Sequence, residues 1–211
     1  SNSHGVKIQS PAHSAGQSYT MKLPTGNITA GKFLKVDSIT GSGTTAVGQL
    51  SFADEPGGGK VLQVVSTTKT DVFTSSTNSF VDITGLSATI TPTLSSSKIM
   101  VICSMIISGQ NGTLYAYKLL RGSTDICVGD AAGSRTRASI FGQHNSAYEG
   151  ESVSITILDS PSTTSATTYK MQGRAETSSS QRIAVNASDN DGDSANIGRG
   201  ASTITVMEIA T

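Results

Sequence analysis

The segment KIMVICSMIIS, residues 98–108, is the longest apolar stretch of the chain. In an extended strand, successive side chains point to opposite faces. Apolar residues would occupy both faces here: Ile99, Val101, Cys103 and Met105 on one, and Met100, Ile102 and Ile106 on the other. A strand that is apolar on both sides needs cover on both sides, so this segment predicts the central strand of a sheet.

The segments around this strand alternate between apolar and polar residues, which predicts strands with one face exposed to water. The alternation is clearest at Leu86, Ala88 and Ile90, at Val153, Ile155 and Ile157, at Tyr169 and Met171, and at Ile183 and Val185. No window of ten or more residues has the three-four spacing of an amphipathic helix. Turn-forming clusters separate the segments at residues 108–112, 129–134, 142–150, 160–165, 177–180 and 187–200. Residues 61–211 therefore predict an all-β, jelly-roll-like antiparallel β-sandwich with about ten to twelve strands.

The composition excludes several classes of protein. Fifteen basic residues balance fifteen acidic ones without a charged run, so there is no electrostatic footprint for duplex nucleic acid. The longest apolar stretch is too short to span a bilayer, and no membrane insertion is expected. No cofactor is expected either, because no phosphate-binding glycine motif and no Cys or His cluster for zinc is present.

Residues 1–60 differ from the rest of the chain, because they are poor in large apolar residues and rich in Gly and Pro. Such a segment buries too little apolar surface to fold alone. Copies that wind together could shelter Val6, Ile8, Leu23, Phe33, Leu34 and Val36. We therefore predict a thin, intertwined N-terminal shaft segment (residues 1–60), a domain boundary at the glycines 57–59 and an oligomer. A disordered leader is the alternative interpretation.

Two parts of the chain resemble tail-fibre-like proteins of marine bacteriophages. Residues 3–24, SHGVKIQSPAHSAGQSYTMKLP, resemble a module that precedes a distal domain in that family. Residues 61–209 carry further similar segments, including FVDITGL (80–86), LRGSTD (120–125), LDSP (158–161) and ASTITVMEI (201–209). Where the family usually has a compact turn and a Trp, this chain has SITGSGTT (38–45) and Phe52.

The resemblance implies a virion structural protein, the distal part of a homotrimeric tail fibre that binds other virion proteins and a bacterial surface glycan or protein. It implies location on the virion. We expect no enzymatic activity, because the sequence lacks a recognisable catalytic constellation. Two alternatives share the same sequence features: a capsid or neck decoration (whisker) protein without a receptor role, and a carbohydrate-binding or depolymerising module.

The sharpest local motif is DNDGD, residues 189–193, in which Asp189, Asp191 and Asp193 alternate as in the start of a calcium loop. Gly192 falls at the fourth position instead of the sixth, and Gly200 stands where the bidentate Glu belongs. A solvated turn is therefore the expected structure, and no metal site is assigned.

The sequence assigns no catalytic residue. The three histidines, His4, His13 and His144, do not follow a nucleophile elbow. Paired carboxylates for glycoside cleavage could come from Asp125, Asp130, Glu149, Glu151, Asp159 and Glu176. Against that interpretation, aromatic residues make up only 5% of the chain and Trp is absent.

The loop GQHNSAYEG, residues 142–150, supplies the receptor-binding candidates His144, Asn145 and Tyr148, because it combines aromatic and amide groups in an adaptable setting. Arg135 and Arg137, two residues apart, are expected to share one face of a strand.

Both cysteines lie in apolar, strand-like runs. Cys103 and Cys127 are therefore expected to be buried free thiols, with a disulfide as the alternative.

Overall fold

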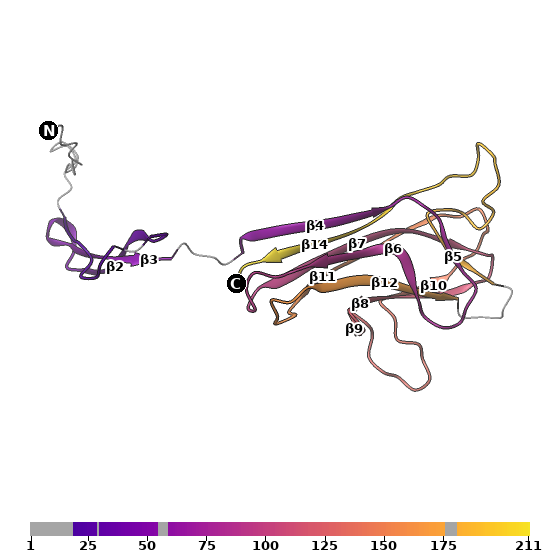
Figure 1. Cartoon of the computed structure of the whole chain (residues 1–211), viewed down its shortest axis with the longest axis horizontal. Helices are drawn as coiled ribbons and strands as arrows, with labels where there is room; N and C mark the ends of the chain where they lie inside the picture. The colour runs from indigo at the N-terminus through magenta and orange to yellow at the C-terminus, as the bar shows by residue number, and fades with distance from the viewer. Residues whose placement is uncertain (1–18, 29, 55–58, 176–180) are drawn as a thin grey trace. The chain divides into compact units, whose positions relative to one another are not determined.

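The computed structural model describes residues 19–28, 30–54, 59–175 and 181–211 (Figure 1). They belong to two compact units, residues 1–57 and 58–211. The predicted shaft residues Val6 and Ile8 lie outside the described residues.

The first unit is a small three-stranded sheet. Its strands are β1 (Thr20–Lys22), β2 (Phe33–Thr40) and β3 (Val47–Ala53), with a 3-10 turn at Gly43–Thr45. The central strand β3 pairs parallel with β1 and antiparallel with β2. Among the described residues of this unit, Leu50 is the only buried apolar side chain, and every residue of β2 is exposed. One copy of the unit therefore has almost no core of its own.

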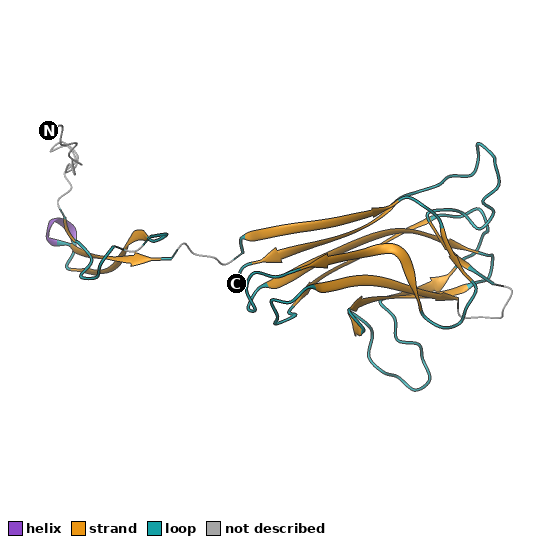
Figure 2. Ribbon diagram, in the orientation of Figure 1, coloured by secondary structure: helices purple, strands orange, loops and turns teal. Residues whose placement is uncertain are grey.

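The second unit contains the remaining strands, all of them antiparallel (Figure 2). They are β4 (Val61–Lys69), β5 (Phe73–Ser75), β6 (Val81–Ile90), β7 (Lys98–Gly109), β8 (Leu114–Arg121), β9 (Thr124–Ile126), β10 (Ile140–Gln143), β11 (Glu151–Asp159), β12 (Thr167–Ala175), β13 (Ile183–Val185) and β14 (Ser202–Ile209). No helix in the described part of the chain is long and apolar enough to cross a membrane.

Eight of these strands form two facing sheets. The first sheet has the order β4-β14-β7-β11, and the second has the order β6-β12-β8-β10. The chain passes repeatedly between the two sheets, which is the double Greek-key arrangement of a jelly roll. The short strands β5, β9 and β13, of three residues each, are accessory. The predicted all-β sandwich is therefore confirmed.

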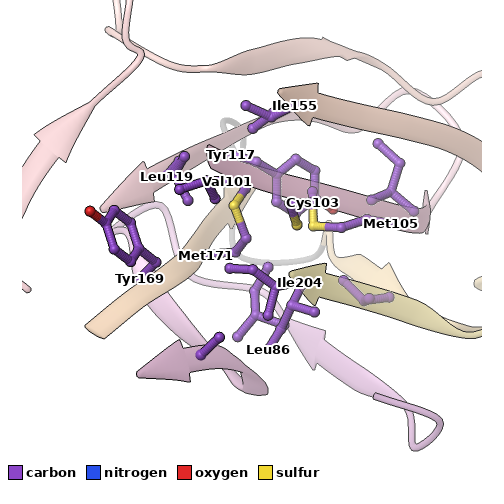
Figure 3. Packing of buried hydrophobic residues seen from close by; sticks show 14 of the residues in the cluster. Leu86, Val101, Cys103, Met105, Tyr117, Leu119, Ile155, Tyr169, Met171 and Ile204 are labelled. Carbon is purple, nitrogen blue, oxygen red and sulfur yellow. The ribbon is translucent and has the colours of Figure 1, made fainter. Parts of the chain in front are cut away.

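The core lies between the two sheets, where alternate residues of each long strand point inward (Figure 3). Val101, Cys103 and Met105 of β7 face Leu119 of β8 and Met171 of β12. All five side chains are at most 1% exposed. The apolar and polar residues that alternate in the sequence of β6, β11 and β12 are thus the inward-facing and outward-facing residues of these strands.

Strand β7 is central, as predicted, because β14 pairs along one edge and β11 along the other. Its second face differs from the prediction. Ile102 on the outward face is 37% exposed, and Met100 and Ile106 are partly exposed. A single chain therefore covers only one of the two apolar faces of this strand.

The outward face of β7 belongs to an apolar row that crosses the whole sheet. Val64 of β4 pairs with Met207 of β14, Met207 pairs with Met100 of β7, and Met100 pairs with Leu158 of β11. Val64 is 55% exposed and Leu158 is 50% exposed. We refer to Val64, Met207, Met100 and Leu158, together with Ile102, as the outer apolar row.

Candidate functional site

The loop that follows β10 carries the three receptor candidates. The His144 backbone N–H donates to the carbonyl of Thr113 (2.9 Å), and the His144 carbonyl accepts from the Gly112 N–H (2.8 Å). These bonds hold the loop against the turn that follows β7. Tyr148 is 69% exposed and Asn145 is exposed. Both side chains remain available to a ligand.

His144 is not available to a ligand, because its side chain is only 1% exposed. Its ring lies against the Tyr115 ring, with centroids 4.3 Å apart. A Cβ at Gly109 would lie 2.5 Å from His144 Cδ2, so the ring needs a glycine beneath it. The structure thus corrects the assignment of His144 from a receptor contact to a core side chain.

Burial also sets the charge of His144. Loss of hydration lowers the pKa of His144, and the nearby carboxylates Glu151, Glu149 and Asp189 only partly oppose that effect. The buried Nε2 atom has no hydrogen-bond partner among the described residues. The imidazole is therefore neutral near pH 7.

Tyr115 links this packing to the opposite sheet. Its hydroxyl donates to Glu151 Oε2 (2.8 Å), which joins β8 of one sheet to β11 of the other. Burial, and then the Glu151 carboxylate, raise the pKa of Tyr115. A Cβ at Gly142 would lie 2.5 Å from the Tyr115 hydroxyl, so β10 can lie this close only with glycine there.

A hollow of about 390 Å³ lies beside Tyr115, between the paired strands β8 and β10 and the loop that joins β9 to β10. We call it the β8–β10 hollow. Its wall is formed by Leu114, Tyr115, Ala116, Phe141 and Gly142 of the strands and by residues 129, 130, 132 and 135–138 of the loop. Ligand pockets commonly enclose about 300–1,000 Å³, so this hollow could hold a small ligand.

The loop side of the hollow contributes its charges. Arg137 Nε donates to the Gly129 carbonyl (2.7 Å), and Arg135 Nη1 donates to the Ala132 carbonyl (3.3 Å). The carboxylate-bearing residue Asp130 lines the same hollow. Arg135 and Arg137 therefore lie in a loop, not on a strand face as the sequence predicted.

Sequence reasoning missed the hollow. The glycines around residues 129–134 correctly marked a turn, but they could not show that the turn lies beside β8 and β10. Phe141 faces the hollow and is 82% exposed, which period-two alternation alone could not distinguish from an ordinary outward position.

Three of the six acidic residues considered for glycoside cleavage, Asp125, Asp159 and Glu151, are held by different partners. Asp125 pairs with Lys118 (2.9 Å), and Asp159 accepts two hydrogen bonds from Arg121 Nη1 (2.8 Å each) and one from the Tyr169 hydroxyl (2.7 Å). Glu151 accepts the Tyr115 bond, and Glu176 lies outside the described residues. The Asp159 cluster joins the two sheets, which is a structural role.

The DNDGD motif, residues 189–193, pairs with arginines. Asp191 accepts from Arg199 Nε (2.9 Å) and Nη2 (2.6 Å), and Asp189 forms an ion pair with Arg182 (2.5 Å). Within the described ranges, no group of three or more His, Cys, Asp or Glu side chains could hold a metal ion. The arginines thus occupy carboxylates that a calcium loop would use as ligands.

The cysteines are both free thiols. Cys103 is buried as predicted, and burial raises the pKa of its thiol to about 12. Cys127 is exposed, and the prediction that it is buried was wrong. Its φ of 55° shows that the strand has already ended there, because such a value belongs to the left-handed region.

Comparisons with solved structures give distant matches. No protein-family model and no curated protein matches the chain. A structure of infectious bursal disease virus, Gt strain, matches with a TM-score of 0.40 and 16% identity, over 77% of this chain and 40% of the viral chain. The Gx strain structure matches with a TM-score of 0.39 and 14% identity, over 77% and 39% of the two chains. This chain thus spans about two fifths of the length of each match.

Proposed function

We propose that this chain is a non-enzymatic structural protein of a bacteriophage particle, the distal part of a homotrimeric appendage that supports attachment to a bacterial surface. The resemblance of residues 3–24 and 61–209 to tail-fibre-like proteins supports the virion assignment. The same proposal places the chain on a tail fibre and not on the capsid or the neck.

The observation that carries the proposal is the missing core of the first unit. Phe33, Leu34, Val36 and Ile39 of β2 are 39%, 50%, 46% and 68% exposed. Only Leu50 is buried among the apolar residues described there. A strand that exposes this much apolar surface in one chain is a hazard in a monomer. Equivalent strands of two further copies would cover it.

The outer apolar row supports self-association independently. Among the outward residues of β4, β7, β11 and β14, Lys98 is the only charged one, and it lies at the end of β7. Depletion of charge is typical of the buried centre of an interface. A second copy of the same face supplies an uncharged surface with a matching apolar row and introduces no unpaired charge.

Native mass measurement tests the oligomer. The chain mass is 21.6 kDa, and the expected particle has three times that mass at micromolar concentration. A folded species of single-chain mass under the same conditions would contradict the proposal.

Electron microscopy of particles labelled with an antibody against residues 58–211 tests the position. Label on a tail appendage is the expected result. Label on the capsid or the neck would support a decoration protein instead, and unlabelled particles would exclude the virion assignment.

A further inference from the structure

The β8–β10 hollow combines an apolar wall with arginines. Phe141 of β10 pairs with Ala116 of β8, so the two residues share the outward face of the second sheet, and Leu114 lies two positions further along that face. Phe141 is 82% exposed and Leu114 is 42% exposed, whereas Ala116 is only 1% exposed. Phe141 and Leu114 thus expose apolar side chains on this face, and residues of the loop 129–138 line the same hollow.

The loop offers charged donors to the same space. Arg135 and Arg137 each bond a carbonyl of their own loop, which fixes the guanidinium and uses few of its five N–H donors. Neither arginine forms an ion pair with another described residue. The remaining donors can bind a planar anion with two oxygens in the bidentate geometry that guanidinium favours.

Asp130 adds a hydrogen-bond acceptor to the hollow. Its carboxylate can accept hydrogen bonds from hydroxyl groups, which neither arginine can do. A ligand that suits the whole hollow therefore has a carboxylate, several hydroxyls and an apolar C–H face to lie against Phe141. A pyranose ring that bears a carboxylate has all three.

We propose that the β8–β10 hollow binds a carboxylated sugar, either free or as a unit of an acidic polysaccharide. Arg135 and Arg137 bind the carboxylate, Asp130 accepts sugar hydroxyls, and the Phe141 ring supports the C–H face. The chemistry of the hollow does not depend on the virion assignment, so either proposal can fail without the other.

Amide chemical-shift titration of the full chain with sodium glucuronate tests the site, with glucose and inorganic phosphate as parallel probes. Glucuronate at millimolar concentration is expected to shift the amide signals of residues around the hollow. Glucose and phosphate should need at least about tenfold higher concentrations to produce the same shifts. Equal binding of phosphate or glucose would overturn the assignment to a carboxylated sugar. So would the absence of any shift with glucuronate and with an oligoglucuronate.

Matched variants locate the interaction. Arg135→Gln with Arg137→Gln, and separately Phe141→Ala, are each expected to weaken glucuronate binding about tenfold or more. Leu94→Ala and Lys98→Gln remove an exposed apolar and an exposed charged side chain elsewhere, and they should leave binding unchanged. Equal weakening in all four proteins would overturn the site.

An oligoglucuronate distinguishes the two sources of the ligand. Tighter binding of the oligomer than of the free sugar identifies a polysaccharide unit, and equal affinity per sugar identifies the free sugar. Both outcomes support the hollow as the site, provided that Phe141→Ala weakens the binding of both ligands.

Discussion

Asn186 is a buried polar residue that joins three segments at one end of the sandwich. It is fully buried, with φ of 69° in the left-handed region. Its Nδ2 donates to the carbonyls of Lys69 (2.8 Å) and Asp71 (3.1 Å), and its Oδ1 accepts from the Ser202 hydroxyl (2.6 Å). One amide thereby joins β4, the segment after it and β14.

Replacing Asn186 with Ala is expected to lower the free energy of unfolding by about 3 kcal/mol, because buried partners lose their bonds and Ala resists positive φ. Asn186→Gly tolerates the backbone angle and should cost less. Urea unfolding measures both, with Asn196→Ala in an exposed loop as the control. If the Ala variant unfolds at the wild-type urea concentration, the role assigned to this amide is wrong.

His144 makes stability depend on pH. An unfolded histidine has a pKa of about 6.5, and burial lowers the pKa of His144 in the folded chain. Below about pH 6.5, the unfolded chain therefore binds a proton that the folded chain does not. Stability is present above that pH and falls on acidification, by at most about 1.4 kcal/mol per pH unit for one proton.

Urea unfolding between pH 7.5 and 5.5 measures this slope. The wild type should lose stability on acidification, and His144→Gln should lose less, whatever its stability at pH 7.5. Because His4 and His13 are common to both proteins, the difference between the slopes isolates His144. Identical slopes would show that the ring titrates normally.

Among the elements, strand β7 connects the core to a second, outward surface. Its inward residues fill the sandwich, and its outward Met100 and Ile102 belong to the outer apolar row. Ile102→Glu is expected to leave the fold intact, since the side chain is 37% exposed, and to weaken the proposed self-association by placing a charge within the uncharged face.

The control is Ser87→Glu on the exposed side of β6, where the new carboxylate faces Lys170 across the strand pair. Sedimentation velocity over a concentration series compares the two variants. If Ile102→Glu remains as strongly associated as Ser87→Glu, the outer apolar row is not an interface between copies.

For the whole molecule, the large apolar core lies within the second unit, and the proposed oligomer assigns association mainly to the first. Residues 58–211 contain the entire large core, so this fragment is expected to fold alone with an all-β circular dichroism spectrum. Without the exposed strand β2 it should associate more weakly than the full chain. A fragment that is unfolded, or that associates as strongly as the full chain, would contradict this division.

The sequence predicted the inner architecture well because burial on one face leaves a periodic signal. Leu86, Ala88 and Ile90 alternate in the sequence and are all buried, as are Tyr169 and Met171. The both-sided apolar pattern at β7 correctly placed that strand at the centre. It did not show that one chain leaves the second face uncovered.

The predictions failed where position depends on partners distant in sequence. His144 is buried because Tyr115 and Gly109 receive its ring, and neither is near it in the sequence. Cys127 follows a short strand that ends one residue earlier and is exposed. The apolar residues beside it in the sequence therefore wrongly indicated burial. Arg135 and Arg137 lie in a loop whose placement against β8 and β10 has no periodic signature.

The first and last strands of the sandwich are neighbours. β4 pairs with β14, the Gly59 N–H donates to the Ala210 carbonyl (2.7 Å), and the Ala210 N–H donates to the Lys60 carbonyl (2.9 Å). By register along β7, this corner is remote from the turn 110–113 and the loop 144–150. A fluorescent dye or an affinity tag joined to Thr211 would consequently emerge beside Gly59 and Lys60 and leave the opposite end of the sandwich unobstructed.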